Sequence, residues 1–483
     1  MRVLEGLEPQ NVFYYFEEIT RIPHGSGNIG QISDYLRDFA RERNLFHVQD
    51  KWGNVVIIKE ASAGFEGEAP YILQAHIDMV AVAAQGCDID MKTEPLKLKT
   101  EAGKIYAENT SLGGDDGIGV AYCLALLDAK EIALPRLEVI LTADEETGME
   151  GAKEIDLSML QGHRMINLDQ EEEGIFIVSC AGGARVDVDI SLKEESDKSA
   201  MKQLAVSVKG LLGGHSGIEI DRGRGNANWI LGAVLCGLSL RYDIRLSKMQ
   251  GGQADNAIPR EAEALIWVRE ADIPEIDAFL KAEEQKWKNE LGEADSGLIL
   301  EKVFHDGIVC GACFTRESTA QALACLCKLP NGVIDMSADV EGLVETSLNL
   351  GVMSFREDGL RLSYAVRSSV DQSREELCRN MIQIAERAGA AAQVRNVYPG
   401  WAYRKESPLR DRMAAVYREL YGKEPTVEAI HAGLECGILA GKIADLDCVS
   451  IGPDLSDVHT AEERMDIASA GRVWDYLLAV LSK

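Results

Sequence analysis

The sequence lacks an excess of basic residues and any long uninterrupted apolar run. It contains 50 Lys and Arg residues against 79 Asp and Glu residues, so its formal net charge is -29. A field of this sign repels phosphate backbones and anionic membrane surfaces, and we therefore expect no nucleic-acid partner. No stretch reaches the roughly 18 consecutive apolar residues that a membrane-spanning helix needs, so we expect no membrane partner either.

The sequence also lacks paired cysteines and an apolar leader. Its eleven cysteines are an odd number, and none of them has the pairwise spacing of a metal site. Cys325 and Cys327 lie two residues apart in an apolar helical pattern, where small buried thiols are the usual finding. Glutamates interrupt the N-terminal segment, unlike the apolar core of a secretory leader. These features favour a reducing cytoplasm.

The composition is that of an ordinary globular protein with two or three domains. Hydrophobic residues make up 46% and charged residues 27% of the 483 residues, and this length allows a large buried core. In residues 1–185 short apolar runs alternate with helical patterns. Such alternation is typical of an α/β domain whose mostly parallel central sheet is flanked by helices. The predicted strands are 54–58, 71–75, 137–142 and 165–168, and the predicted helices are 11–20, 31–43 and 117–128.

The middle of the chain has a different pattern. Longer alternating strands are separated by single helices, and two successive sets of these elements form a weak internal repeat. The predicted helices are 226–240 and 275–291 in the first set, and 317–328 and 374–388 in the second. Each set is typical of an α+β unit. We therefore predict an α/β domain formed by residues 1–185 and 394–483, interrupted by an inserted α+β domain at residues 186–393.

His76 and Asp78 come directly after the predicted strand 71–75. As residues i and i+2 of an extended backbone they face the same side. His76 can therefore bind a metal ion while Asp78 orients a ligand or a base. The triplet alone is a weak signal, because a histidine at a strand end is more often structural.

Asp115 and Asp116 lie between glycines directly before the predicted helix 117–128. Negative charge is favoured at a helix N-terminus, so an N-cap pair is the simplest explanation of these two residues by themselves. Helix capping and metal binding both remain open at this point.

Three consecutive acids, Asp144, Glu145 and Glu146, follow the predicted strand 137–142. Carboxylates in one cleft repel one another unless a cation or protons neutralise them. Glu145 and Glu146 could divide the work, one binding a metal ion and the other acting as a general base. A solvated charged loop explains the same run equally well when it is taken alone.

Asp169 and His459 complete a set of two histidines and at least three carboxylates near strand ends. Open α/β sheets bind their ligands at the carboxyl ends of strands. Zinc accepts imidazole nitrogen and carboxylate oxygen, and two such ions ~3.5–4 Å apart form a clamp used in hydrolytic sites. The sequence therefore predicts a two-metal hydrolytic site, and the absence of an HExxH motif excludes a thermolysin-type peptidase.

These motifs resemble those of a known family. The strings HID, GGDDGIG, DEETG and NLD, together with the terminal His459, resemble the M20 family of dinuclear zinc peptidases. Longer strings resemble one branch of that family, the aminoacyl-histidine dipeptidases, also called Xaa-His dipeptidases or bacterial carnosinases. These strings are GGHSGIEI, GRGNAN, NAIPREAEA, LPNGV, EGLVETSLNLGV, VRSS and HAGLECG, and the resemblance covers the chain from about residue 10 to its end.

The resemblance implies a site for two Zn²⁺ ions, with Co²⁺ or Mn²⁺ as substitutes. The metal ligands that it implies are His76, Asp115, Glu146, Asp169 and His459. Asp115 would bridge the two ions, and each ion would take one histidine and one terminal carboxylate. Asp78 would orient His76, and Glu145 would be the general base. Asp116 receives no ligand role.

The resemblance also implies substrate contacts in and near the inserted domain, which is called the lid in this family. His215 would polarise the scissile carbonyl, Arg367 would bind the C-terminal carboxylate of the substrate, and Asn256 would be a further contact. Gly433 and Glu435 would line a wall of the pocket, where Glu435 is a candidate partner for the free α-ammonium. A clamp at each end would select a dipeptide.

The expected function is hydrolysis of unblocked dipeptides, with Xaa-His dipeptides such as β-alanyl-histidine as substrates. A hydroxide bridging two metal ions would attack the peptide carbonyl, with Glu145 taking the proton of the water. One alternative is a deacylase of N-acyl amino acids on the same scaffold. Another is an inactive metal-binding interaction protein, which the presence of the predicted base and all five ligands disfavours. The sequence leaves open the preferred dipeptide, the working metal, and whether a homodimer forms in which His215 acts across subunits.

Overall fold

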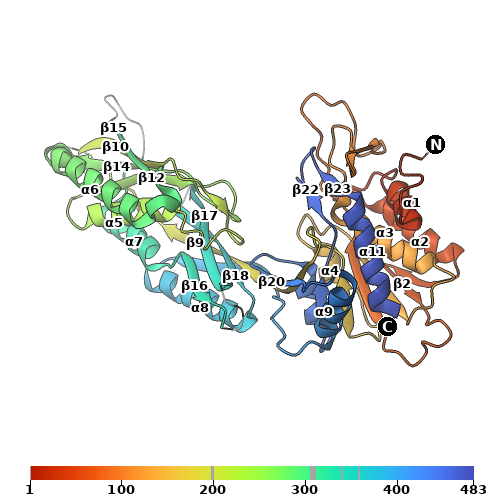
Figure 1. Ribbon diagram of the computed structural model, residues 1–483. Coiled ribbons are helices and arrows are strands. Elements are labelled where there is room, and N and C mark those ends of the chain that lie inside the picture. The colour runs from red at the N-terminus through yellow and green to blue at the C-terminus, as the bar shows by residue number, and fades with distance from the viewer. Residues whose placement is uncertain are drawn as a thin grey trace. The chain divides into compact units, whose positions relative to one another are not determined.

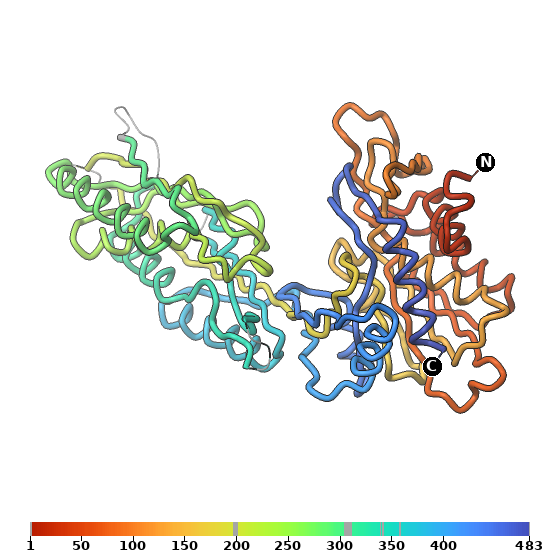
Figure 2. Tube along the Cα trace, in the orientation of Figure 1, coloured from red at the N-terminus to blue at the C-terminus, as the bar shows by residue number. Residues whose placement is uncertain are grey.

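The structure is a computed structural model that describes residues 2–196, 201–304, 312–338, 340, 342–356 and 359–482. The chain divides into two compact units. Unit 1 contains residues 1–179, 403–429 and 434–483, and unit 2 contains residues 180–402 and 430–433. The N-terminal and C-terminal parts of the chain therefore fold together in unit 1, as the red and blue ends of the trace in Figure 2 show.

Unit 1 is built on an eight-stranded sheet in the order β1-β2-β6-β3-β7-β21-β8-β20. Figure 1 labels β2 and β20 of this sheet. The neighbouring strands β6, β3, β7 and β21 are parallel, whereas β1, β2 and β8 pair antiparallel at the two sides. This arrangement confirms the predicted α/β class. The strands are β1 (Phe46–Gln49), β2 (Val55–Lys59), β3 (Tyr71–His76), β6 (Leu137–Thr142), β7 (Arg164–Asn167), β8 (Ile175–Cys180), β20 (Thr426–Ile430) and β21 (Asp447–Ser450).

Helices and a small second sheet complete unit 1. The helices are α1 (Gln10–Ile19), α2 (Gly30–Glu42), α3 (Gly114–Asp128), α4 (Glu150–Glu154), α9 (Pro408–Tyr421), α10 (Glu435–Lys442) and α11 (Ile467–Ser482). Helix α3 is apolar on all sides and almost entirely buried, as a helix covered by other elements must be. The small sheet has the order β22-β23-β5-β4, with β4 (Leu98–Glu101), β5 (Lys104–Ala107), β22 (Leu455–Ser456) and β23 (Arg464–Asp466).

Unit 2 contains a nine-stranded sheet, and every strand pairing identified in it is antiparallel. Its order is β15-β10-β14-β12-β17-β18-β9-β19, and β16 pairs with β17 beside this path. The strands are β9 (Gly182–Ser191), β10 (Met201–Lys209), β12 (Arg245–Gly251), β14 (Ala262–Arg269), β15 (Ile299–Phe304), β16 (Gly332–Met336), β17 (Val344–Arg356), β18 (Gly359–Ser368) and β19 (Ala391–Tyr398). A separate two-stranded sheet joins β11 (Gly214–His215) to β13 (Ala257–Ile258).

Apart from β16, the nine-stranded sheet consists of two four-stranded halves with the same strand order. One half contains β10, β12, β14 and β15, and the other contains β9, β17, β18 and β19. When the strands of each half are numbered 1 to 4 in chain order, both halves have the spatial order 4-1-3-2, read from the outer edge of the sheet. The halves meet where β12 pairs with β17 at Gly251 and Met353. In one half, helix α5 (Ala227–Ser239) lies between β10 and β12, and helix α6 (Ile273–Leu291) lies between β14 and β15. In the other half, helix α7 (Arg316–Lys328) precedes β17, and helix α8 (Asp371–Arg387) lies between β18 and β19.

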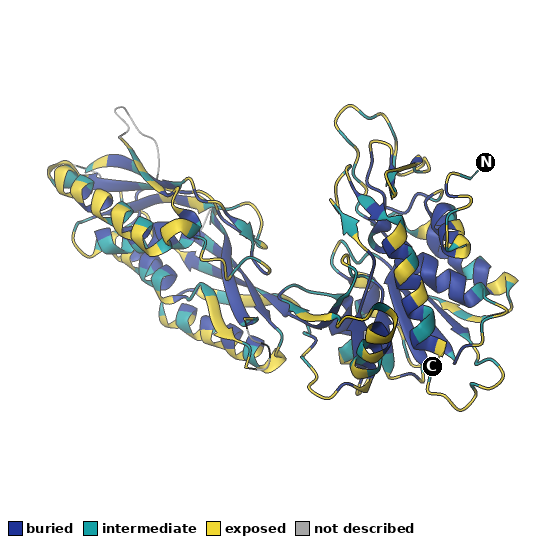
Figure 3. Ribbon diagram, viewed as in Figure 1, coloured by how far each residue is buried: buried dark blue, intermediate teal, exposed yellow. Residues whose placement is uncertain are grey.

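The four long helices of unit 2 pack against its sheet. They are α5 (Ala227–Ser239), α6 (Ile273–Leu291), α7 (Arg316–Lys328) and α8 (Asp371–Arg387), and their apolar faces share one core with the strands. The strands of both units are mostly buried while the outer faces of the helices are exposed, as Figure 3 shows. None of the helices in the described part of the chain has the length and apolarity that crossing a bilayer requires.

Candidate metal centre

The predicted metal ligands of unit 1 lie at one edge of its central sheet. Strand β3 pairs in parallel with β6, with His76 opposite Thr142, and with β7, with Gln74 opposite Asn167. The carboxyl ends of the three strands therefore coincide. This register brings His76, the acidic loop after Thr142 and Asp169 to the same edge, as the sequence predicts for a ligand site of an open α/β sheet.

Asp115 lies between the two predicted histidine ligands. Its Oδ1 is 2.9 Å from His76 Nε2, and its Oδ2 is 3.0 Å from His459 Nε2. The two histidines are far apart in the sequence, and the two oxygens of one carboxylate face one imidazole each. This arrangement fits the bridging role that the resemblance implies for Asp115.

Each imidazole also faces a second carboxylate. His76 Nε2 lies 3.3 Å from Asp169 Oδ1, and His459 Nε2 lies 2.9 Å from Glu146 Oε1. Each imidazole nitrogen therefore lies close to one oxygen of Asp115 and to one oxygen of another carboxylate. The donor set fits two divalent cations that accept imidazole and carboxylate ligands, such as zinc.

The electrostatics of the group fit a cation as well. Hydrogen bonds with Asp115 and Glu146 raise the pKa of His459 to about 10. Burial raises the pKa of Asp169 to about 7, even though His76 acts in the opposite direction. The neighbouring carboxylates therefore favour a positive charge on the His459 imidazole, and burial disfavours the ionised form of Asp169. A divalent cation would satisfy both tendencies.

Asp78 orients several parts of this group. His76 Nδ1 is 2.9 Å from the backbone oxygen of Asp78 and 3.6 Å from its Oδ1. The same carboxylate accepts hydrogen bonds from the backbone N–H of Glu145 at 3.0 Å and from Ser26 Oγ at 2.8 Å. Asp78 is 1% exposed. It therefore fixes both the His76 ring and the start of the acidic loop, a link to Ser26 that the sequence pattern did not reveal.

Glu145 stands beside the two ligand groups. One of its carboxylate oxygens falls within a cluster with His76 and Glu146 that could hold a metal ion. Burial raises the pKa of Glu145 well above its usual range. A carboxyl group in this environment can hold a proton near neutral pH, which a residue that takes and returns a proton must do.

Asp116 contacts the site without facing both histidines. Its Oδ2 accepts a hydrogen bond from the backbone N–H of His76 at 3.2 Å, and its Oδ1 accepts one from Gly119 at 3.2 Å. The peptide bond between Asp115 and Asp116 is cis. Asp116 is 1% exposed, and one of its carboxylate oxygens also lies within 4.8 Å of ligand atoms of His76 and Asp169, in a group that could hold a metal ion.

A buried polar layer lies directly behind the ligands on the same strands. Gln74 Nε2 donates to Glu435 Oε2 at 2.6 Å, and Asn167 Nδ2 donates to Gln74 Oε1 at 2.5 Å. Thr142 Oγ1 also donates to Glu435 Oε2, at 2.5 Å. Glu435, a predicted substrate contact, is therefore fully buried within unit 1.

The remaining predicted substrate contacts lie together in unit 2. His215 Nδ1 accepts hydrogen bonds from the backbone N–H groups of Gly217 and Ile218, each at 3.2 Å, which leaves Nε2 as the N–H of the neutral ring. Burial and the nearby Arg367 lower the pKa of His215. A Cβ atom at Gly217 would lie 3.0 Å from His215 Cε1 and 3.2 Å from Arg367 Nε. His215 and Arg367 are therefore neighbours.

Arg367 is a buried guanidinium in this group. It is 5% exposed, its Nη1 is 3.5 Å from Tyr398 Oη, and its Nε has no hydrogen-bond partner within the described residues. Gly433 packs on the same Tyr398 ring. The exposed Asn256 is linked to the group through its backbone oxygen, which accepts from Ser216 N–H at 2.9 Å.

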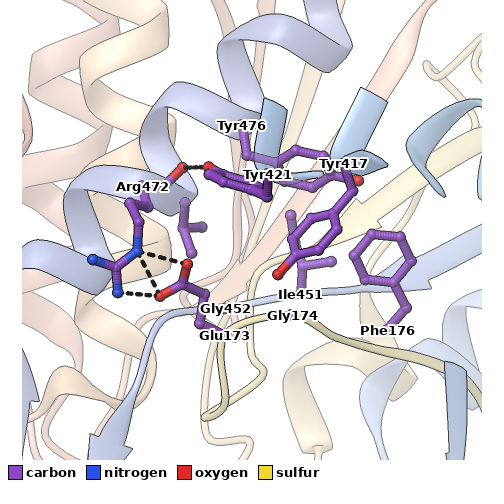
Figure 4. Close-up of a pocket in the computed structure, with 10 residues that line it drawn as sticks. Glu173, Gly174, Phe176, Tyr417, Tyr421, Ile451, Gly452, Arg472 and Tyr476 are labelled. Carbon is purple, nitrogen blue, oxygen red and sulfur yellow. Dashed lines mark hydrogen bonds and ion pairs between the residues drawn. The ribbon is translucent and has the colours of Figure 1, made fainter. Parts of the chain in front are cut away.

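A separate cavity in unit 1 does not qualify as a substrate site. It has a volume of about 10 Å³, and four of its ten lining residues are aromatic. Two others, Glu173 and Arg472, are joined by an ion pair (Figure 4). A cavity of this size holds roughly one water molecule. It contains none of the predicted site residues, and the packing of Phe176, Tyr417 and Tyr476 around it is that of a core.

Comparisons with known proteins agree with this geometry. A profile of peptidase family M20/M25/M40 matches residues 72–483. The cytosol non-specific dipeptidase of Escherichia coli (strain K12) is 36% identical over 486 aligned residues, which cover 100% of this chain and 99% of the relative.

Solved structures show the same architecture. The crystal structure of aminoacylhistidine dipeptidase from Vibrio alginolyticus superposes with a TM-score of 0.93 at 34% identity, covering 99% of this chain and 97% of that one. The crystal structure of aminopeptidase PepT from Bacillus cereus superposes with a TM-score of 0.61 at 16% identity, over 99% and 98% of the two chains. The second likeness concerns the fold alone.

Proposed function

The chain belongs to peptidase family M20/M25/M40, and we propose that it is a metal-dependent dipeptidase acting on unblocked dipeptides. The observation that carries the proposal is the position of Asp115, whose two oxygens face His76 and His459 at 2.9 and 3.0 Å. The printed names of two full-length relatives, a non-specific dipeptidase and an aminoacylhistidine dipeptidase, support the substrate class. The name of the first relative also supports a place in the cytosol.

Two metal ions would be held by five side chains. His76, Asp169 and one oxygen of Asp115 would hold one ion, and His459, Glu146 and the other oxygen of Asp115 would hold the second. When bound, such ions acidify a water molecule and polarise a carbonyl group. Zinc fits the donor set, and cobalt or manganese would be substitutes.

Glu145 would act as the general base. It would accept a proton from the attacking water and deliver that proton to the leaving amine nitrogen when the C–N bond breaks. Its buried position supports both halves of this cycle, because burial raises its pKa. Asp78 would hold the loop in place through its contact with Glu145 N–H at 3.0 Å.

Residues of unit 2 would bind and polarise the substrate. His215 presents an N–H at Nε2, which would donate to the carbonyl oxygen as negative charge develops there. Arg367 would form charge-assisted hydrogen bonds with the C-terminal carboxylate of the dipeptide. A buried guanidinium gains an anionic partner in this way, which supports the assignment. Asn256 and Gly433 would line the same pocket.

The specificity for a C-terminal histidine is part of the proposal. Xaa-His dipeptides, including β-alanyl-histidine, are the expected substrates by likeness to the aminoacylhistidine dipeptidase. The name of the other relative points to wider acceptance. A panel that varies the C-terminal residue at constant N-terminal residue would therefore define the preference.

The test compares chelator-treated protein with protein to which zinc is restored, on one substrate panel. The panel contains β-alanyl-histidine, other Xaa-His and non-His dipeptides, one dipeptide amide and N-acetyl amino acids. We expect zinc-dependent hydrolysis of the free dipeptides. Hydrolysis of N-acetyl amino acids but not of dipeptides would identify a deacylase and overturn the proposal. Stoichiometric metal binding without any hydrolysis would identify an inactive binding protein.

A further inference from the structure

Glu463 is a buried carboxylate that binds the loop carrying Asp115. Its Oε2 accepts hydrogen bonds from the backbone N–H groups of Leu112 at 2.8 Å and Gly113 at 3.1 Å. Its Oε1 accepts a third from Gly114 N–H at 2.8 Å. The side chain is 2% exposed, and both of its oxygens are used. One acidic residue thus holds the three residues that directly precede Asp115.

These three N–H groups have no partner from their own helix. They lie at the N-terminal end of α3, where helical N–H groups point away from the helix and need an acceptor. The N-cap residue is Gly113, with φ of 67° and no side chain that could accept. Backbone angles at Asp115 and Asp116 also depart from helical values. The first turn of α3 is therefore irregular, and its position depends on an acceptor from elsewhere in the chain.

Glu463 itself lies in the loop that carries His459. Strands β22 and β23 pair with Leu455 opposite Met465, so residues 457–463 form the hairpin connection between them. Within this connection Thr460 Oγ1 donates to the backbone oxygen of Asp457 at 2.6 Å, and Glu463 N–H donates to Thr460 O at 3.4 Å. His459 and Glu463 thus belong to one internally bonded loop.

The contact therefore joins two loops that are about 350 residues apart in sequence. One loop presents Asp115 and the other presents His459, and these two side chains approach to 3.0 Å. His459 is half-exposed and has a left-handed backbone with φ of 64°, so burial of its own ring does little to fix its place. Glu463 provides a direct link between the backbones of the two loops.

We propose that Glu463 is a positioning residue that sets the separation of Asp115 and His459 and thereby the affinity of the second metal ion. The inference rests on the proposed metal-dependent function. Glu463 is neither a candidate metal ligand nor a candidate substrate contact; it acts through the backbone of residues 112–114 and through its own loop. Residues that orient metal ligands typically change metal affinity about 10–100-fold when they are replaced.

The variants separate positioning from simple stabilisation. Glu463→Gln keeps the shape of the side chain but turns an N–H donor toward at least one backbone N–H, and Glu463→Asp keeps the charge but shortens the reach. Glu462→Gln is the matched control, because Glu462 is the exposed neighbour of the same type. Tyr122→Phe is the structural control, because Tyr122 lies on the same helix α3 as Asp115. This substitution removes the buried hydrogen bond from Tyr122 Oη to the backbone oxygen of Ala470.

The measurement is a zinc titration of chelator-treated protein, followed by the visible spectrum of the cobalt-loaded form. In Glu463→Gln and Glu463→Asp we expect the affinity for one of the two ions to fall about 10–100-fold and the cobalt spectrum to change. Glu462→Gln should titrate as the wild type does. Tyr122→Phe should lower the unfolding temperature while both affinities stay unchanged.

The possible failures are distinguishable. Wild-type protein that binds no zinc stoichiometrically would overturn the proposed function itself. Wild-type protein with two bound ions, together with folded Glu463 variants that keep both affinities and the cobalt spectrum, would overturn only the positioning role. Equal losses of affinity in Tyr122→Phe and Glu463→Gln would also overturn it, because general weakening of α3 would then explain the effect.

Discussion

Glu435 Oε2 accepts a hydrogen bond from Gln74 Nε2 at 2.6 Å in the interior of unit 1. Gln74 lies on β3 two residues before His76, so both side chains face the same side of the strand. The carboxyl group of Glu435 is therefore built into the layer that supports the candidate metal centre. Its other oxygen, Oε1, has no hydrogen-bond partner within the described residues. A fully buried carboxyl group is a poor partner for a substrate ammonium, and a supporting role in this layer fits its contacts better.

Glu435 should make the stability of the metal-free protein depend on pH. Burial raises its pKa to about 8 from the usual 4.5, against the opposing hydrogen bond from Thr142. The folded state therefore binds this proton more tightly than the unfolded state does. The resulting stabilisation is complete below about pH 4.5 and is lost as the pH rises through about 8. At about 1.4 kcal/mol for each pKa unit, the change amounts to a few kcal/mol.

Replacing Glu435 by Gln should remove this dependence, because the amide keeps the shape and carries no titrating proton. We expect the unfolding midpoint of Glu435→Gln, measured relative to wild type in chelator-treated protein, to rise steadily between pH 5 and about 8.5. Glu428→Gln serves as the control, since Glu428 is exposed on β20. A difference between Glu435→Gln and wild type that stays constant over this range would show that Glu435 is ionised in the folded state.

The sequence could place His76 and Asp169 at strand ends because both residues are tied to local patterns. Each buried parallel strand is short, apolar and followed at once by its polar residue, so His76 and Asp169 could be assigned to strand ends. The helices of unit 2 were equally predictable, since their apolar spacing is strong: 226–240 was predicted and α5 covers Ala227–Ser239. In these cases the neighbours along the chain determine the structure.

Contacts between distant segments could not be predicted in this way. The acidic pattern around His459 gives no sign that Glu463 accepts three N–H groups near Asp115, because nothing local specifies that partner. The burial of Glu435 was equally hidden, since a glutamate at the start of a short helix usually faces solvent. Which oxygen of Asp115 faces which histidine also depends on the packing of separate loops.

Asp115 and Glu146 should differ in how many ions their loss affects. Asp115 contacts the imidazoles of both His76 and His459, whereas Glu146 contacts the imidazole of His459. We expect Asp115→Ala to weaken the binding of both ions and Glu146→Ala to weaken mainly one. Metal content after dialysis against a low concentration of zinc, measured by elemental analysis, checks this. Full retention of two ions by Asp115→Ala would contradict the bridging position.

Glu145 should be required for turnover but not for metal binding. If it acts as the general base, Glu145→Ala leaves all five candidate ligands in place and removes the proton acceptor. We expect kcat to fall by about 10²–10⁴-fold, while the zinc content stays equal to that of wild type. Glu150→Ala, which alters an exposed glutamate a few residues later in the chain, should keep both activity and zinc. Substantial turnover by zinc-loaded Glu145→Ala would refute the role.

Arg367 should discriminate between dipeptides and their amides. Its guanidinium is 5% exposed and would meet the C-terminal carboxylate through hydrogen bonds between charged groups, each worth about 1.5–3 kcal/mol. We expect Arg367→Met to lower kcat/KM for a free dipeptide by at least roughly tenfold. The variant should fold, because an apolar side chain of similar length avoids burying an unpaired charge.

The C-terminal amide of the same dipeptide is the control substrate, since it lacks the charge that Arg367 would bind. Wild-type protein should therefore hydrolyse the amide more slowly than the free dipeptide, whereas Arg367→Met should hydrolyse the two at similar rates. The coupling between the substitution and the substrate change isolates the proposed ion pair from any general damage to unit 2. Equal losses of kcat/KM on both substrates would place the substrate carboxylate elsewhere and leave Arg367 with a structural role.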